Sequence, residues 1–337
     1  MVTVGVIGLG MMGSTHLDVY RKRSDVKVLA ISDLIPEKLT GKARATGNIE
    51  GQAQGGFDFA SARQYPEGMQ LIQDPDVELV DICLPTPLHV DYAIAALKAG
   101  KHVLVEKPLG LTAKDARRLA AAAAKAKTFA MCAQCIRFWP GWDWVKEAVQ
   151  KQTYGKVLSA HFRRLASHPG GPFYGNGEAC GGGALDLHIH DADFVQYCFG
   201  MPSAVTSCGY AKPTNRIDHI LTQYHYADVP LVVAEGGWAM SPGFPFTMQY
   251  IVNFEQATAV YDLAAAEPFK LVRDGKAEAV ALRPGMGYEH EIAYFLECIR
   301  NGTAPSTVSI ASAAETVRLV EAEVKSVLTG KTVKVRW

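Results

Sequence analysis

The stretch Gly8-Leu9-Gly10-Met11-Met12-Gly13 decides the fold of the N-terminal part of the chain. It follows an apolar, β-branched run at residues 2–7, which we predict to be a buried strand, and it opens a helix predicted over residues 11–22. A second apolar strand, residues 26–31, is followed by Asp33, twenty positions after Gly13. A strand, a glycine turn, a helix and an acidic residue at this distance form the dinucleotide-binding fingerprint.

The glycines and the helix start each have a physical reason to be there. Gly8 permits the tight turn, Gly10 lets the backbone approach a pyrophosphate, and Gly13 lets the helix pack closely on the sheet. The N–H groups of Met11 and Met12, in the first helical turn, are expected to face the phosphates together with the positive end of the helix dipole. The turn therefore predicts a nicotinamide dinucleotide as cofactor.

Asp33 bears on the choice between NAD and NADP. A carboxylate at the end of the second strand accepts hydrogen bonds from both ribose hydroxyls of NAD and repels a 2′-phosphate. The residues that follow, Leu34-Ile35-Pro36, include no arginine that would receive such a phosphate. We therefore expect NAD, with NADP the less favoured cofactor.

Strands and helices alternate up to about residue 135. Further strands are predicted at residues 78–84, 102–105 and 129–133, and helices at residues 88–99 and 113–127, the second N-capped by Thr112. These strands are short and apolar on both faces, which is typical of a parallel sheet covered by helices on both sides. Residues 1–135 are thus predicted to be a doubly wound, Rossmann-type NAD-binding domain.

The pattern changes after residue 135. One amphipathic helix, residues 142–151, precedes a series of alternating strands predicted at 157–165, 203–210, 218–226, 230–238, 247–255, 258–263, 269–273 and 278–283. Helices are predicted at 187–199, 288–301 and 309–328. Residues 136–337 are therefore predicted to be an α+β domain with an open, mostly antiparallel sheet that binds substrate and forms the oligomer.

Composition excludes several classes of protein. Lys plus Arg and Asp plus Glu both number 34, so net charge is zero, and neither a nucleic-acid partner nor an anionic membrane is indicated. No apolar stretch approaches the ~20 residues of a membrane span, and no charged leader precedes the first strand. Seven scattered cysteines fit reduced thiols better than a disulfide framework, so we expect a cytoplasmic protein.

Three further segments resemble one family. They are Thr86-Pro87-Leu88-His89, the run Ala99–Pro108 that contains Glu106-Lys107-Pro108, and Gly181–Asp193, which contains Gly-Gly-Gly-Ala-Leu-Asp-Leu-His-Ile-His. With the glycine turn they resemble the Gfo/Idh/MocA oxidoreductases, named for glucose–fructose oxidoreductase, inositol dehydrogenase and a rhizopine-catabolism protein. The resemblance covers essentially the whole chain, including Phe295–Pro305.

The resemblance implies roles for individual residues. It implies that Pro85, Thr86, His89 and Glu106 contact the cofactor, and that Lys107 lies beside the nicotinamide and the substrate hydroxyl. Asp186 and His190 correspond to the family's Asp and the His four residues later, which face the same substrate. The chain departs from the family pattern at His188, where glycine is frequent, and at Cys135-Ile136-Arg137-Phe138 in place of an Asn-Arg-Arg-Phe-type segment.

The same residues make chemical sense together. Oxidation of an alcohol requires a base for the hydroxyl proton, and histidine is the usual choice near neutral pH. Asp186 and His190 stand at i and i+4, so on a helix the carboxylate would orient the imidazole and raise its basicity. A cation such as Lys107 near the developing alkoxide would stabilise its charge. Lys107, Asp186 and His190 are the predicted catalytic residues.

Other residues near these segments are weaker candidates. The ones predicted to line a substrate pocket are His188, Arg137, Arg163, Tyr174 and Trp238, together with His168. On a helix, His188 and His190 point in nearly opposite directions, so only one of them faces the substrate. A metal at His188-Ile189-His190 or at the pair Cys132 and Cys135 is the alternative interpretation, and we expect no metal.

These inferences predict an NAD(P)-dependent dehydrogenase for a secondary alcohol of a sugar, cyclitol or related polyol. One alternative is an enzyme that uses NAD transiently to eliminate or hydrolyse at a glycosidic bond. Another is a non-catalytic cofactor-binding regulator, which the presence of both Lys107 and His190 disfavours. The exposed face of an open sheet requires cover, and the family resemblance implies a homodimer or homotetramer.

Overall fold

The computed structural model describes residues 1–42 and 56–335. The chain forms two compact units, the first made of Met1–Cys135 with Gly287–Ala314 and the second of Ile136–Met286 with Glu315–Trp337. The sequence-based division at residue 135 had assigned residues 287–314 to the second domain. They belong to the first unit because the helix they contain packs against the first helix of the chain.

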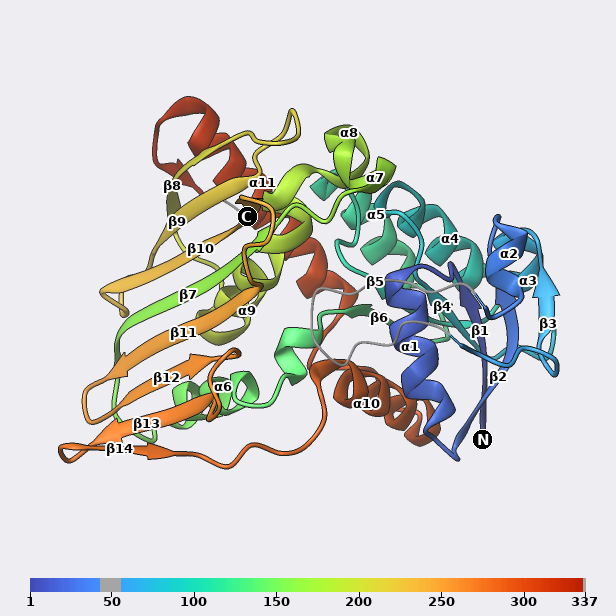
Figure 1. Cartoon of the computed structure of the whole chain (residues 1–337), viewed down its shortest axis with the longest axis horizontal. Coiled ribbons are helices and arrows are strands. Elements are labelled where there is room, and N and C mark those ends of the chain that lie inside the picture. Colours follow the sequence, from blue (N-terminus) through green and yellow to red (C-terminus); the bar gives the residue numbers. More distant parts are fainter. Residues whose placement is uncertain (43–55, 336–337) are drawn as a thin grey trace. The chain divides into compact units, whose positions relative to one another are not determined.

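The first unit contains a six-stranded parallel sheet with the strand order β3-β2-β1-β4-β5-β6 (Figure 1). Its strands are β1 (Val2–Ile7), β2 (Val26–Ser32), β3 (Arg63–Tyr65), β4 (Leu79–Ile82), β5 (His102–Glu106) and β6 (Ala130–Ala133). The order reverses between β1 and β4, which is the switch point at which such sheets bind ligands. The predicted doubly wound parallel sheet is confirmed, and only the short strand β3 went unpredicted.

Helices cover both faces of this sheet. On one face α1 (Met11–Arg21) packs against α10 (Gly287–Asn301), and on the other α4 (Thr86–Lys98) packs against α3 (Gly68–Ile72) and α5 (Ala113–Ala123). Right-handed crossovers in the two directions from β1 require this arrangement. The Thr112 hydroxyl accepts the Asp115 N–H at the start of α5, which confirms the predicted cap. A short helix, α2 (Pro36–Leu39), follows β2.

The second unit contains a nine-stranded sheet with the order β14-β13-β12-β11-β7-β10-β9-β8-β15 (Figure 1). Its strands are β7 (Val157–Ser167), β8 (Ala204–Tyr210), β9 (His219–His225), β10 (Leu231–Met240), β11 (Thr247–Phe254), β12 (Thr258–Asp262), β13 (Phe269–Arg273), β14 (Lys276–Ala279) and β15 (Val333–Lys334). All neighbours are antiparallel except β7 and β10, which confirms the mostly antiparallel prediction.

One predicted strand was misplaced. The prediction put it at residues 278–283, whereas β14 is Lys276–Ala279 and pairs with β13. Asp274 and Gly275 both have positive φ, 52° and 72°, which is the geometry of a two-residue hairpin turn. Such a turn starts the return strand directly after Gly275.

The two faces of the nine-stranded sheet differ in character. The inner face packs under α6 (Trp142–Lys151), the π-helical turn η2 (Ala184–His188), α9 (Ile189–Phe199) and the C-terminal part of α11 (Ile310–Thr329). One inner row across the sheet is buried: Ser207, Thr222, Ala234, Phe162, Tyr250, Tyr261 and Phe269. The adjacent outer row is exposed or half-exposed: Thr206, Gln223, Val233, His161, Ile251, Val260 and Lys270.

The remaining elements connect these layers. They are the 3₁₀ turn η1 (Cys135–Phe138) and the short helices α7 (Gly171–Gly175) and α8 (Gly177–Cys180). The bonds Lys107–Pro108 and Lys212–Pro213 are cis. None of the helices in the described part of the chain combines the length and apolar character that a membrane span requires.

Candidate functional site

The glycine turn between β1 and α1 is held by close backbone contacts. Gly8 has a φ of +91°, and a Cβ there would lie 2.5 Å from the Cys83 carbonyl oxygen. A Cβ on Gly13 would lie 1.9 Å from the Gly8 carbonyl oxygen. Either substitution would push the turn off β4 or off its own helix, so the geometry requires glycine at both positions.

Gly10 differs from its two neighbours, because a Cβ at this position would meet no atom within 4 Å. The space beside it is open, as a turn must be if a phosphate is to approach the backbone. Gly10 is also the N-cap of α1, and no side chain caps the N–H groups that follow it. The first N–H groups of a helix have no partner within the helix, so those of Met11, Met12 and Gly13 are suited to bind a pyrophosphate.

Asp33 lies just after β2 and is bonded to the same turn. Its carboxylate accepts the Leu9 N–H at 2.8 Å and the Ile35 N–H at 2.9 Å, and the Lys38 ammonium lies 3.2 Å from Oδ2. The Leu9 contact places Asp33 directly beside the glycine turn, as an acidic residue that binds a ribose must be. Lys38 adds a cation that the sequence reasoning did not consider.

His89 joins two loops at the carboxyl edge of the sheet. It is buried in α4, which begins at Thr86 with Pro85 as its N-cap. Its Nδ1 lies 2.8 Å from the Pro108 carbonyl and its Nε2 2.6 Å from the Leu84 carbonyl. Burial lowers the pKa of His89 despite these carbonyls, so the neutral ring donates to one of them. His89 thereby fastens the Lys107-Pro108 segment to the end of β4.

Glu106 and Lys107 follow at the end of β5. Glu106 is buried, and its Oε2 accepts the Lys107 backbone N–H at 3.0 Å. Its Oε1 lies 3.3 Å from Nε2 of His16, a buried histidine of α1. The Lys107 N–H is thus held by Glu106, and the carbonyl of the next residue, Pro108, is held by His89.

Asp186 and His190 both belong to the second unit. Asp186 lies within η2, and His190 is the second residue of α9. Both side chains are half-buried, whereas His188 between them is buried completely. Asp186 and His190 are therefore partly accessible, whereas His188 is not.

His188 points into the interior of the second unit. Its Nε2 lies 2.9 Å from a carboxylate oxygen of Glu323 on α11 and 3.4 Å from the Tyr224 hydroxyl. A Cβ on Gly236 would lie 2.6 Å from the His188 ring, so a glycine at this position of the sheet leaves the space that the ring occupies. These contacts place His188 in the core rather than at a substrate-facing surface.

The two arginines predicted to line a pocket lie in different places. Arg137 is buried and makes a two-pronged ion pair with Asp193, at 2.7 and 2.6 Å, with its guanidinium 4.7 Å above the Tyr197 ring. Arg163 is half-exposed and pairs with Glu235 at 2.9 Å on the outer face of the sheet. Arg163 therefore lies on the face opposite to the helices that carry Asp186 and His190.

Tyr174, Trp238 and His168 form one aromatic group. The Trp238 ring lies 5.8 Å from that of Tyr174 and 5.4 Å from that of His168, and the group packs beside Leu187 of η2. Trp238 itself is buried and donates its indole N–H to Asp218 at 2.7 Å. The structure thus places these three residues next to the segment that contains Asp186 and His190.

Comparison with known protein families identifies both parts of the chain. Residues 2–134 match the oxidoreductase family with an NAD-binding Rossmann fold that bears the name GFO_IDH_MocA, and residues 142–260 match the GFO/IDH/MocA C-terminal domain. The chain belongs to the Gfo/Idh/MocA oxidoreductase family. Its first unit is an NAD(P)-binding Rossmann domain.

Relatives in this family include several dehydrogenases. The chain is 33% identical over 198 residues to myo-inositol 2-dehydrogenase of Thermotoga maritima and 30% identical over 212 residues to levoglucosan dehydrogenase of Pseudarthrobacter phenanthrenivorans. These matches cover 58% and 61% of this chain, and the chain spans about half the length of the two relatives, 54% and 53%. A bovine trans-1,2-dihydrobenzene-1,2-diol dehydrogenase is 25% identical with 90% of both chains covered.

Solved structures show the same fold. A levoglucosan dehydrogenase in complex with NADH and levoglucosan superposes with a TM-score of 0.86 at 21% identity, covering 100% of both chains. A probable dehydrogenase from Thermotoga maritima superposes with a TM-score of 0.80 at 24% identity, covering 99% of this chain and 98% of the other. These likenesses establish the two-part Gfo/Idh/MocA architecture.

Metal-capable side chains gather at a place that the sequence reasoning did not propose. In residues 1–42 and 56–335, the one group of three such donors is His16, Asp81 and Cys83, whose ligand atoms lie within 4.8 Å of one another. Hydrogen bonds join them, with His16 Nδ1 2.8 Å from Asp81 and the Cys83 thiol 3.5 Å from the same carboxylate. Burial raises the pKa of the Cys83 thiol, which keeps it protonated.

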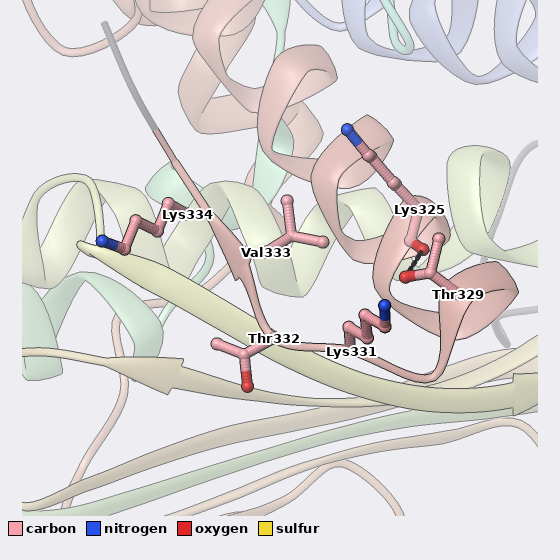
Figure 2. A pocket seen from close by; sticks show the side chains of 6 residues that line it. All are labelled: Lys325, Thr329, Lys331, Thr332, Val333 and Lys334. Carbon is pink, nitrogen blue, oxygen red and sulfur yellow. Dashed lines mark hydrogen bonds between the residues drawn. The ribbon is translucent and has the colours of Figure 1, made fainter.

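A surface hollow of about 660 Å³ lies at the end of α11 and beside β15. Figure 2 shows its lining, in which the ammonium groups of Lys325, Lys331 and Lys334 point in different directions. The Thr329 hydroxyl donates to the Lys325 carbonyl at 2.8 Å. None of the predicted site residues lines this hollow.

Sequence reasoning missed the buried acids that hold the site segments. Asp218 accepts the Gly183 N–H at 3.2 Å as well as the Trp238 indole, and so anchors the glycine run before Asp186. Asp81 lies in the middle of β4 and is fully buried. An acid within an apolar strand was a detectable signal, whereas nothing local distinguishes Asp218 from a turn residue.

Proposed function

We propose that this protein is an NAD-dependent dehydrogenase that oxidises a secondary alcohol of a sugar, cyclitol or related polyol. The observation that carries the proposal is the open backbone at Gly10 above an uncapped helix start, with Asp33 bonded to the same turn. This arrangement fits a dinucleotide pyrophosphate and its adenosine ribose. The relatives named above, dehydrogenases of inositol, levoglucosan and a dihydrodiol, support the substrate class.

Three residues are proposed to carry the chemistry. When bound, the nicotinamide ring supplies the acceptor for the hydride that leaves the alcohol carbon. The His190 imidazole takes the hydroxyl proton, and Asp186 orients that ring. The Lys107 ammonium stabilises the negative charge that develops on the substrate oxygen. Support for these roles comes from the family resemblance and from the half-buried placement of Asp186 and His190.

The reaction class is tested with a panel of inositols, sugars and sugar acids with NAD, followed by NADH absorbance. We expect net NADH formation with at least one polyol. Release of product without net NADH would instead indicate transient use of the cofactor. Absence of any reaction, together with undiminished NADH binding, would favour a regulator.

The residue roles are tested with Lys107→Ala and His190→Ala. Loss of a general base or of a charge-stabilising donor lowers turnover by about 10²–10⁴-fold. NADH binding, measured by fluorescence, should stay unchanged in His190→Ala. Matched controls are Lys114→Ala on α5 and His161→Ala on the outer face of the sheet, both at exposed positions. Full turnover in either test variant would refute the role of that residue.

NAD is proposed to be preferred over NADP. The Asp33 carboxylate disfavours a 2′-phosphate, although the Lys38 ammonium 3.2 Å from it reduces that repulsion. We expect a higher kcat/KM with NAD than with NADP. The ratio of the NAD value to the NADP value should be larger in Lys38→Met, because the neutralising cation is absent there. A higher kcat/KM with NADP in the unmodified protein would contradict this preference.

Two further properties are proposed with the activity. The half-exposed outer face of the nine-stranded sheet, with Ile251 at its centre, supports assembly as a homodimer or homotetramer. All seven cysteines are free thiols, which supports a reducing, cytoplasmic compartment.

A further inference from the structure

A buried polar network lies directly beneath the glycine turn of the first unit. The His16 Nδ1 lies 2.8 Å from an Asp81 oxygen that also accepts the Tyr20 hydroxyl at 2.8 Å. The His16 Nε2 lies 3.3 Å from Oε1 of Glu106. Glu291, on α10, is fully buried, and the charges of His16, Glu106 and Asp81 act on its carboxyl group. The network thus joins α1, β4, β5 and α10.

The network holds more acids than bases. Burial lowers the pKa of His16, but Asp81 and Cys83 together outweigh it, so the pKa of His16 lies well above its usual value. Burial raises the pKa of Glu291 well above its usual value, and the Glu106 and Asp81 carboxylates add to the effect. Neither carboxyl oxygen of Glu291 has a hydrogen-bond partner among the described residues. These directions favour a protonated His16 and a protonated, neutral Glu291 within the network.

The network is connected to the proposed catalytic residue Lys107 through the Glu106 carboxylate. Glu106 uses Oε1 toward His16 and Oε2 to accept the Lys107 N–H at 3.0 Å. One oxygen of the Glu106 carboxylate thus faces the His16 ring, and the other accepts the Lys107 backbone N–H. Fully buried groups of this kind adopt one arrangement, because any other leaves a charge unpaired.

We propose that His16 is a positioning residue that acts through the Glu106 carboxylate to fix the backbone of Lys107. This inference rests on the proposed function, because it gives His16 an effect on turnover only if Lys107 acts on the substrate. His16 touches neither Lys107 nor the backbone of the glycine turn by any hydrogen bond of the described network. Its influence on catalysis is therefore indirect.

The variant His16→Asn isolates the contact that matters. An asparagine amide can still donate to Asp81 in place of Nδ1, but it does not reach Glu106. The matched control is Tyr20→Phe, which removes a hydrogen bond to the same Asp81 and leaves Glu106 untouched. A purely structural role predicts that both variants lower the melting temperature and neither changes kcat/KM per folded molecule.

The positioning role predicts a different outcome. A small misplacement of a catalytic group costs about tenfold to a hundredfold in rate, so kcat/KM should fall by that factor in His16→Asn and stay nearly unchanged in Tyr20→Phe. The NADH dissociation constant, measured by fluorescence, should change little in either variant. Glu106→Gln should lower kcat/KM by a similar factor, because an amide whose oxygen accepts the Lys107 N–H turns its NH2 group, a donor, toward His16 Nε2.

A double-mutant cycle gives the decisive comparison. If His16 acts through Lys107, then His16→Asn combined with Lys107→Ala should be no slower than Lys107→Ala alone. Additive losses would overturn the inference while leaving the proposed function intact. An active Lys107→Ala would overturn the proposed function and the inference with it. If His16→Asn fails to fold, Glu106→Gln takes its place in the same cycle with Lys107→Ala.

Discussion

The two units of the chain bury their charges in different ways. The second unit pairs three of its buried acids with one basic residue each: Arg137 with Asp193, Arg164 with Asp191 at 2.8 Å, and His188 with Glu323. The first unit instead gathers three acidic side chains around one histidine beneath the glycine turn. The pairs join α9, or the η2 turn before it, to β7, η1 and α11, whereas the network reaches the strand end that carries Lys107.

The difference separates two uses of buried charge. A one-to-one pair is balanced in charge, and it fixes how a helix packs on a sheet. Removing one partner destabilises the fold mainly because the other charge is then buried without compensation. A network with a surplus of acid has to hold a proton, and its geometry depends on where that proton resides. We therefore expect variants in the second unit to change stability, and variants in the network to change pH dependence and turnover.

The largest effect on stability is expected from Arg137→Met. It leaves Asp193 buried with the Thr316 hydroxyl, at 2.8 Å, in place of a guanidinium. An uncompensated buried charge costs about 3–5 kcal/mol in the free energy of unfolding, which urea denaturation would measure. The double variant Arg137→Met/Asp193→Leu should recover most of the loss. A loss as small as that of an exposed pair would show that water reaches the site.

A smaller loss is expected from His188→Leu. It removes the imidazole that lies 2.9 Å from Glu323 and leaves that buried carboxyl group without this partner. The unsatisfied hydrogen-bonding group costs about 1–3 kcal/mol, measured by urea denaturation at pH 7. Glu323→Gln, which keeps an acceptor for the ring, is the control and should lose less. A variant as stable as the parent would mean that the pair contributes nothing net.

Glu291→Gln tests the surplus acid through pH. The folded pKa of Glu291 is raised above its usual value of 4.5, so the folded protein binds a proton that the unfolded chain releases. This contribution to stability is complete below pH 4.5 and is lost as pH rises through the folded pKa. The neutral, isosteric glutamine avoids that loss. The melting temperature of Glu291→Gln minus that of the parent should therefore increase as pH rises from 5 to 8.

The control for this prediction is Glu289→Gln on the same helix. Parallel melting curves for Glu291→Gln and the parent across this pH range would show that Glu291 is already ionised in the folded protein. The titratable groups that act on Glu291 are His16 on α1, Asp81 on β4 and Glu106 on β5.

The smallest effect on stability is expected from Ile251→Asp. The residue lies on the outer face of the nine-stranded sheet and is 50% exposed, so the free energy of unfolding should change by no more than about 0.5 kcal/mol. If that face forms the oligomer, light scattering should show smaller assemblies for this variant. Leu328→Asp, at an exposed position on α11, is the control. An unchanged mass would direct the search to another surface.

Local signals predicted most of the fold. The alternation of apolar runs with helical segments identified both sheets, and the capping residue Thr112 correctly predicted the start of its helix. The short elements β3, α3, α7 and α8 escaped because three to five residues carry too little periodicity to stand out. The assignment of α10 to the first unit escaped for another reason. Its apolar face is visible in the sequence, but the partner it packs against is not.

The glycine turn shows what the sequence alone determined. Its spacing to Asp33 is local information, and backbone geometry leaves no other residue type at Gly8 and Gly13. The tertiary structure decided which polar residues are buried and with what partners. His188 and Arg137 face the core, Arg163 faces away from it, and His16 lies beside Glu106. Those pairings join residues far apart in the chain, and only the folded sheets bring such residues within hydrogen-bond distance.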